Sequence, residues 1–538
     1  MVDLSFLLKT GAIAVVVFVT LILVYKTGKI AKTMQTMEEP APAQKAEATQ
    51  MPAPGGEMIE TWDVFDTLLA RYCKNPGEVF AIVADRTGIK EFPELRARAQ
   101  SDLDGIRLPY RIADIYRKIQ EYGVSSELAS RMMQEEMNVE LDQVIPIRRN
   151  LERVRRTDIL VSDMYLPGEF IADLLTQAGD MPVARPIVVG NWGKSTGEIW
   201  PLLQSRYRLV LHHGDNRHSD GIVPNQAGLA TEIVNDHHYS DWERMLCDEG
   251  GEDCARLLRE CRLRSQPAEH SVLYDLVCGP FLTLLLTYAI TLHEKYRDAS
   301  ALAFCSRDCD QLGSVFRALY PETPAFNVDL NRHLTYFGTH DSFFNSQLPD
   351  GTVIVDFMSS GRSLLGYLKR NPSISAVFNT FIYLDERLNA DERTQRAEEV
   401  RNGIFAYQHE LSDFTGRAWS LEILLQTGYD RVVDIAREPD SGAVVRLHAA
   451  EAWAREESAF LDFKQLAVNN LIRCVRRRNW KSTVTPERIG SMAKRAVAEL
   501  LAREDALHHV STFSAREDAL NRQLQSSTKA GGLNFTIR

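Results

Sequence analysis

Hydrophobic and polar positions follow two different spacings between residues 58 and 245. Short β-rich runs read DILVSDM, RPIVVGN, RLVLHHGD and ATEIVND, and TWDVFD near the start of the region supplies a fifth. Most of these runs precede a loop and then a segment whose apolar residues recur every three or four positions, as in an amphipathic helix. Strands that alternate with helices predict an α/β fold with a mainly parallel, Rossmann-like sheet, in which ligands bind at the carboxyl ends of the strands.

A long helical stretch interrupts this alternation. Between about 76 and 155, successive segments space their apolar residues at three and four and end near a glycine or proline. They read PGEVFAIVADRTG, PELRARAQSDLDG, RIADIYRKIQEYG and ELASRMMQEEMNVELDQV. We therefore predict a helical insertion after the first strand of the sheet.

The α/β pattern appears again between 268 and 417, which predicts a second α/β domain. Strands are expected at SALAFCSRD, AFNVDL, TVIVDF and VFNTFIYL. The first helix, SVLYDLVCGPFLTLLLTYAITLHEKY, is apolar enough for a membrane span, but Asp275 and the Gly279-Pro280 pair favour a buried core helix. Residues 418–538 are expected to be helical and charged, with a polar tail.

The N-terminal residues 1–33 are predicted to form a transmembrane anchor. The run GAIAVVVFVTLILVY at 11–25 is uncharged and, with the apolar residues before it, reaches the roughly 20 residues that cross a bilayer. Lysines follow it at 26–32, so the positive-inside rule keeps the C-terminal side in the cytoplasm. Residues 34–57, rich in Pro and Ala, are expected to be a linker. We expect a single-pass protein of the inner membrane with its soluble domains in the cytoplasm.

Charge and cysteine usage exclude two classes of function. The net charge of −11 argues against a nucleic-acid-binding protein, which needs a basic face to displace counterions from phosphates. The eight cysteines include no CxxC pair and no cluster with zinc-ligand spacing. We therefore predict neither a nucleic-acid partner nor a structural zinc site.

Polar residues suited to phosphoryl chemistry follow the predicted strands of the first sheet. In chain order they are Asp63, Asp66, Ser162, Lys194, Asp215 and Asp220. This order resembles the motifs of the haloacid dehalogenase (HAD) superfamily. Those motifs supply an aspartate first, then a serine or threonine, then a lysine, and finally an acidic pair that follows a Gly-Asp. This resemblance covers residues 58 to about 240 and implies that the helical insertion at about 76–155 is a cap.

The resemblance also implies a Mg²⁺-dependent mechanism. Asp63 would be the nucleophile and, with the acidic pair Asp215 and Asp220, a ligand of Mg²⁺. Lys194 would neutralise a phosphate oxygen, and the Ser162 hydroxyl would donate to another.

The sequence departs from the phosphatase pattern at Phe65. Phosphatases of this superfamily usually carry a second aspartate there, as general acid and base for the leaving group. The Phe65 carbonyl can still be a metal ligand, whereas its side chain cannot move a proton. Asp66 either substitutes for the missing acid or only braces the turn.

Longer matches narrow the resemblance to one subgroup. DVFDTLLAR, VSDMYLP, KSTGEIW and GDNRHSDG are similar to HAD hydrolases found beside, or fused to, glycosyltransferases in bacterial surface-polysaccharide loci. This similarity implies a small phosphorylated substrate, such as a sugar phosphate, and polysaccharide-assembly proteins as partners.

The second domain has its own candidate ligand site. TVIVDFMSSGRSLLGYL reads as a strand, a carboxylate, a Ser-Ser-Gly turn and a helix, and resembles the diphosphate-sugar loop of phosphoribosyltransferases, except that Val355 replaces a residue that is usually acidic. An ordinary strand-turn-helix junction is the alternative. The candidate residues are Arg307, Asp308, Asp356, Ser360, Gly361, Arg362 and Ser363.

Three hypotheses follow from the sequence. The first is a membrane-anchored hydrolase that uses Asp63. The second is a HAD-like binding or scaffold module without turnover, which Phe65 favours. The third is a transferase whose active site contains Asp356 in the second domain.

Overall fold

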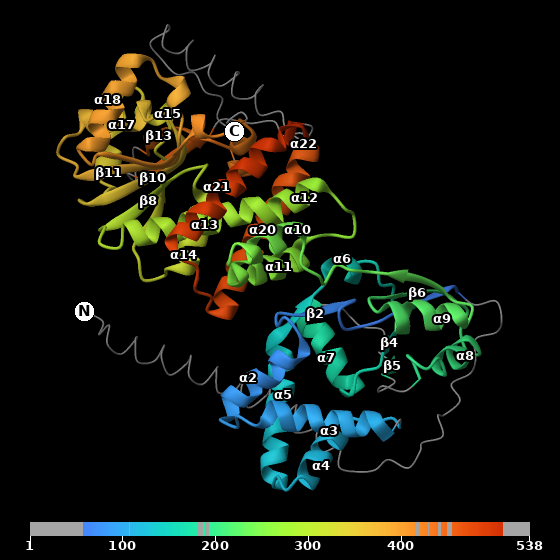
Figure 1. The fold of residues 1–538 in the computed structure, drawn as a ribbon. Helices are drawn as coiled ribbons and strands as arrows, with labels where there is room; N and C mark the ends of the chain where they lie inside the picture. The colour runs from blue at the N-terminus through green and yellow to red at the C-terminus, as the bar shows by residue number, and fades with distance from the viewer. Residues whose placement is uncertain are drawn as a thin grey trace. The chain divides into compact units, whose positions relative to one another are not determined.

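Figure 1 shows the computed structural model of the chain, which describes residues 57–508 apart from 107, 180–186, 189–192, 416–418, 429, 439–442 and 449–454. The chain forms two compact units, one ending at His237 and the other beginning at His238. The predicted membrane anchor lies outside the described residues, as does the predicted linker up to residue 56.

The first unit is built on a parallel sheet of five strands in the order β5-β4-β1-β6-β7. The central strand β1 lies between β4 and β6, with Trp62 opposite both Leu160 and His213. β4, β5, β6 and β7 fall within predicted runs, and β1 overlaps the run TWDVFD at Thr61 and Trp62. The prediction of a parallel α/β sheet is therefore confirmed. The strands are β1 (Ile59–Trp62), β4 (Ile159–Ser162), β5 (Ile187–Val188), β6 (Leu209–Gly214) and β7 (Ala230–Ile233).

Helices cover both faces of this sheet. Because successive residues of a strand point to opposite faces, Leu160 packs with Trp62 and α7, whereas Ile159 and Val161 pack with Trp200 on the other side. The helices α8 and α9 lie on that second face. The three helices are α7 (Gly168–Gly179), α8 (Ile199–Gln204) and α9 (Val223–Gln226).

The predicted helical insertion is present in the first unit. It consists of α2 (Pro76–Thr87), α3 (Phe92–Ile106), α4 (Ile112–Glu121) and α5 (Ser126–Gln143). The N-cap Asn75 accepts the Glu78 N–H, and a proline in the first turn helps α2 to begin. The helices end before the predicted limit of 155, because the chain enters and leaves them through an antiparallel pair. This pair is β2 (Leu69–Arg71) and β3 (Val144–Pro146), and α6 (Arg148–Leu151) follows.

The second unit contains another parallel sheet of five strands, in the order β12-β11-β10-β8-β9. The predicted strands correspond to β8 to β11, whereas β12 is not among them, because half of FAYQHE is polar and the strand is mostly half-buried at the edge of the sheet. The strands are β8 (Ala301–Cys305), β9 (Ala325–Val328), β10 (Thr352–Ser359), β11 (Ala376–Tyr383) and β12 (Phe405–Glu410). Helices of this layer are α14 (Asp310–Leu319), α15 (Arg332–Thr335), α16 (Asp341–Asn345), α17 (Arg362–Arg370) and α18 (Ala390–Arg401).

The long apolar helix of the second unit is a core helix, as predicted. The segment Val272–Lys295 is apolar enough to cross a membrane, but 89% of its most apolar window lies inside the protein. Pro280 lies in a π-helical turn, where the regular hydrogen-bond pattern is already interrupted. The segment comprises α12 (Val272–Leu276), the π-helical turn (Val277–Phe281) and α13 (Leu282–Lys295). Its core neighbours include α11 (Glu252–Ser265), α20 (Arg455–Arg478) and α21 (Pro486–Ala502).

The C-terminal region departs from the prediction that 418–538 is helical. β13 (Val432–Arg437) and β14 (Val444–His448) form an antiparallel pair whose β-branched residues favour strands. The other described elements are α19 (Trp419–Leu425), α20, α21 and α22 (Glu504–His508). Because α20 and α21 share one core with α13, they belong to the second unit. That unit also takes α10 (Asp241–Asp248) from the predicted first domain.

Candidate functional site

The ends of three neighbouring strands bring predicted residues of the first unit together. Asp63 directly follows β1, Ser162 is the last residue of β4, and Asp215 directly follows β6. The Asp63 N–H donates a 2.8 Å hydrogen bond to the His213 carbonyl, which extends the contact between β1 and β6. The strands run in the same direction, so these residues lie at one edge of the sheet.

Three carboxylates form a cluster at this edge. Asp63, Asp215 and Asp220 each offer an oxygen, and these oxygens lie within 4.8 Å of one another. Asp63 and Asp220 are buried, and Asp215 is half-buried. Carboxylates this close repel one another unless a cation offsets their charge. The cluster therefore has the composition and spacing of a metal site.

One lysine balances only part of the negative charge. Lys194 is buried and forms ion pairs with Asp63 and, at 2.7 Å, with Asp220. Burial acts against the charge of Lys194, but the two carboxylates outweigh it and raise its pKa. Burial also raises the pKa of Asp63 well above its ordinary value and that of Asp215 to about 7, with neighbouring carboxylates adding to both. This deficit of positive charge fits a cation among the carboxylates.

The charge deficit predicts a pH-dependent stability. The pKa of Asp215 is raised from 3.8 to about 7, so this carboxyl binds a proton more readily in the folded protein than in the unfolded chain. The metal-free protein should lose free energy of unfolding as pH rises from about 4 to about 7, and Asp215→Asn should weaken this dependence. Chemical denaturation of both proteins at several pH values, in the presence of EDTA, measures their free energies of unfolding. An identical pH dependence in both proteins would contradict the prediction.

A neutral histidine orients Asp220. The Asp220 carboxylate accepts the Asn216 N–H at 2.9 Å and lies 3.1 Å from His212 Nε2. Although burial acts in the opposite direction, His212 and the nearby lysine hold the pKa of Asp220 below its ordinary value. Burial lowers the pKa of His212 to about 4, so its Nε2–H donates to Asp220 while Nδ1 accepts from the Thr61 hydroxyl at 2.9 Å. A side chain at Gly214 would overlap the Asp220 carboxylate.

Phe65 and Asp66 lie in the turn after β1 and have different surroundings. Phe65 is buried, and the Arg71 guanidinium lies 4.4 Å from the centre of its ring. Arg71 in turn pairs with Glu140 of α5 at 2.9 and 3.1 Å. Asp66 has a φ of 60°, and its charge contributes to the raised pKa of Asp215. Asp66 therefore both forms the turn and acts on the carboxylate cluster.

Sequence reasoning missed two residues of this site. Asp163 follows Ser162, is half-buried, and its charge acts on both Asp63 and Lys194. Its position directly after a strand-end serine is the signal that identifies it. His212 carries no such signal, because a buried histidine inside a strand is indistinguishable in sequence from a core residue.

The predicted site of the second unit surrounds a cavity. Its volume is about 180 Å³, and it lies where the loops after β8 and β10 meet. Of the predicted residues, Gly361 does not line the cavity; it is the N-cap of α17, with a φ of 77°. The predicted residues that line it are Arg307, Asp308, Asp356, Ser360, Arg362 and Ser363.

Several arginines and an aspartate set the charge at this cavity. The guanidinium of the candidate residue Arg362 is not free to face a ligand, because it pairs with Glu392 at 2.8 Å and donates to the Arg387 carbonyl at 2.7 Å. The cavity has further arginines that sequence reasoning missed, Arg332 and Arg431 among them. Burial, with Asp308, raises the pKa of Asp356 to about 7.

Comparisons with known proteins do not extend this description. No protein-family model matches the chain, and no curated protein matches its sequence. The function is therefore argued from the geometry and charge of the two sites.

Proposed function

We propose that the first unit is a Mg²⁺-dependent HAD-type hydrolase that removes phosphate from a small phosphorylated metabolite. The observation that carries the proposal is the buried cluster of Asp63, Asp215 and Asp220 against Lys194, at the carboxyl ends of parallel strands. Carboxylate oxygens suit Mg²⁺, and the Phe65 carbonyl is a further candidate ligand. The order of the motifs along the chain supports the same family.

Each residue has a role in this mechanism. The Asp63 carboxylate attacks phosphorus, the alcohol of the substrate leaves, and water then hydrolyses the aspartyl phosphate to free Asp63 and phosphate. Lys194 orients Asp63 and neutralises a phosphate oxygen, and the Ser162 hydroxyl donates to another. When bound, Mg²⁺ would supply the positive charge that reduces the repulsion between the Asp63 carboxylate and the phosphate. The test is Mg²⁺-dependent phosphate release by the purified chain from a panel of sugar phosphates.

Asp66 is the proposed proton donor to the leaving group. Asp66→Asn keeps a side chain that tolerates positive φ but cannot transfer the proton. Turnover of an alkyl phosphate should fall by about 10²-fold, whereas p-nitrophenyl phosphate, whose leaving group needs no proton, should be affected much less. Equal losses with both substrates would show that Asp66 acts only on the turn.

The location and pathway are part of the same proposal. The apolar run at 11–25 would anchor the protein in the inner membrane with its soluble units in the cytoplasm. Resemblance to hydrolases of surface-polysaccharide loci favours a sugar phosphate as substrate and polysaccharide-assembly proteins as partners. Phe65 favours the alternative of a binding or scaffold module, which predicts ligand binding without phosphate release.

A second candidate function concerns the cavity beside Asp356. Arginines and the serines before α17 favour an anionic ligand, as in a transferase of phosphorylated sugars. Arg307→Gln should weaken the binding of inorganic diphosphate by about 10-fold or more, because it removes a charge-assisted hydrogen bond. Calorimetric titration measures this affinity, and Arg401→Gln, which makes the same change at an exposed position of α18 outside the cavity, is the control that should leave it unchanged. Unaltered binding in Arg307→Gln would exclude this site.

A further inference from the structure

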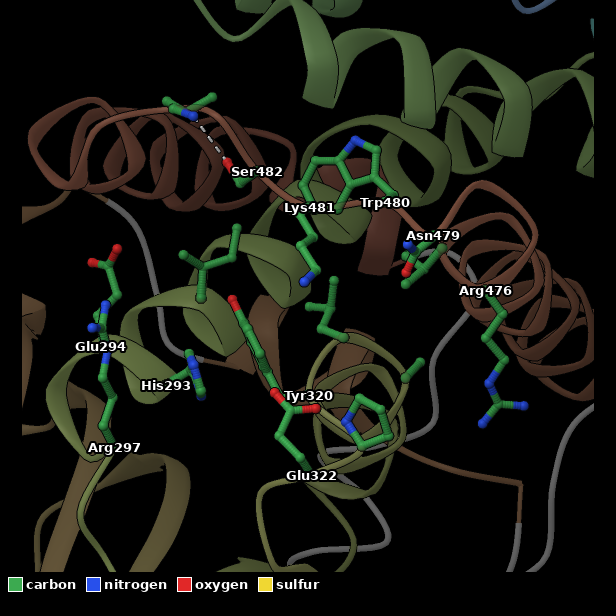
Figure 2. A pocket seen from close by; sticks show the side chains of 16 residues that line it. His293, Glu294, Arg297, Tyr320, Glu322, Arg476, Asn479, Trp480, Lys481 and Ser482 are labelled. Atoms are coloured by element: carbon green, nitrogen blue, oxygen red, sulfur yellow. Dashed lines mark hydrogen bonds between the residues drawn. The ribbon is translucent and has the colours of Figure 1, made fainter. Parts of the chain in front are cut away.

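Figure 2 shows a second cavity in the second unit, with a volume of about 530 Å³. Its walls come from the C-terminal ends of α13, α14 and α20, from the turn after α14, and from the segment that follows α20. It shares no lining residue with the cavity beside Asp356. Its volume lies in the range of small-molecule sites in proteins.

Neutral aromatic and aliphatic groups line part of this cavity. The Tyr320 ring stacks on His293 with 3.7 Å between ring centres and 9° between planes. Burial raises the pKa of Tyr320 to about 12 and lowers that of His293, so both rings are uncharged at neutral pH. Ile290 and Val475 add aliphatic surface. These groups offer an apolar surface to the body of a ligand.

One residue anchors the wall that follows α20. Trp480 is buried, and its Nε1–H donates to the Asp253 carbonyl at 3.3 Å. The next residue, Lys481, is exposed, and Figure 2 shows its side chain directed into the cavity, towards the space that the Tyr320 hydroxyl also faces. The position of Lys481 is thus set by a buried neighbour rather than by an ion pair.

Charges of opposite sign lie on different walls. Lys481 and Arg476 are on the α20 side, whereas Glu294 and Glu322 are on the side of α13 and the turn after α14, where Arg297 offsets part of their charge. Among the described residues, none of these five side chains has a hydrogen-bond or ion-pair partner. A ligand with a charge of one sign would leave one wall unpaired.

We propose that this cavity binds a zwitterion with an apolar body, of the size of an amino acid or a dipeptide. Its amine lies towards Glu322, and its carboxylate lies towards Lys481. The apolar body lies against Tyr320 and Val475. This site does not depend on the phosphoryl chemistry proposed for Asp63.

The dipeptide Phe-Phe and its two singly capped forms test the proposal. In calorimetric titrations of the full chain, N-acetylation should weaken binding by about 10-fold, and so should C-terminal amidation, because each removes one charged contact. Glu322→Gln should abolish the preference for the free amine alone, and Lys481→Gln the preference for the free carboxylate alone. Both residues are exposed, so the variants should fold.

A matched control is available on α18. Glu398→Gln makes the same change as Glu322→Gln at an exposed position outside the cavity and should leave both preferences intact. The proposal is overturned if Phe-Phe does not bind at millimolar concentration, or if the capped forms bind as tightly as the parent. It is also overturned if neither cavity variant changes a preference.

Discussion

Asp63→Asn should reduce phosphate release by at least about 10³-fold at saturating Mg²⁺ and substrate. Asparagine keeps the size of the side chain and one oxygen, but it cannot attack phosphorus as a carboxylate. Asp63 follows the central strand β1, whereas Asp215 and Asp220 come from the chain after β6, so neither can take the position of Asp63. The measurement is phosphate release from a panel of sugar phosphates, with and without Mg²⁺.

The control for this experiment is Asp85→Asn on the exposed side of α2. It makes the same chemical change away from the sheet edge and should leave turnover unaltered. Full activity in Asp63→Asn would rule out Asp63 as the nucleophile. No release by the wild-type protein, in a sample that still binds Mg²⁺, would favour the binding-module alternative instead.

Most strands could be predicted because each is a short apolar run followed by a turn. The β1, β4 and β6 strands are buried along at least part of their length, so their sequences show the pattern that burial requires. β12 was missed because an edge strand that is mostly half-buried tolerates polar residues. Residues 432–448 were read as part of a helical region although VVDIAR and VVRLH favour strands.

The carboxylate cluster could be predicted for a topological reason. Parallel strands that neighbour each other end at the same edge, so Asp63 and Asp215 had to be close once the strand order was known. The contact of Asp220 with Lys194 depends instead on the π-helical turn Arg217–Ile222, which returns Asp220 to the strand end. The orienting role of His212 depends on side-chain direction, which the sequence pattern does not encode.

Lys194→Met should destabilise the first unit more than any surface substitution. Methionine has a similar volume but no charge, so Asp63 and Asp220 would remain buried without their common partner. Breaking a buried ion pair in this way costs about 3–5 kcal/mol of unfolding free energy. Hydrogen exchange in peptides that contain β1 and β6 measures the loss within this unit.

Mg²⁺ should restore part of the stability lost in Lys194→Met, because a cation among the carboxylates offsets the same charge as the lysine. The stabilisation by Mg²⁺ should therefore be larger in the variant than in the wild type. Lys464→Met is the matched control, since Lys464 is also buried but donates to the carbonyls of Leu424 and Gln426. The stability that Lys464→Met loses should not be restored by Mg²⁺. If Mg²⁺ stabilises the wild type and Lys194→Met equally, Lys194 and the metal ion do not offset the charge of the same carboxylates.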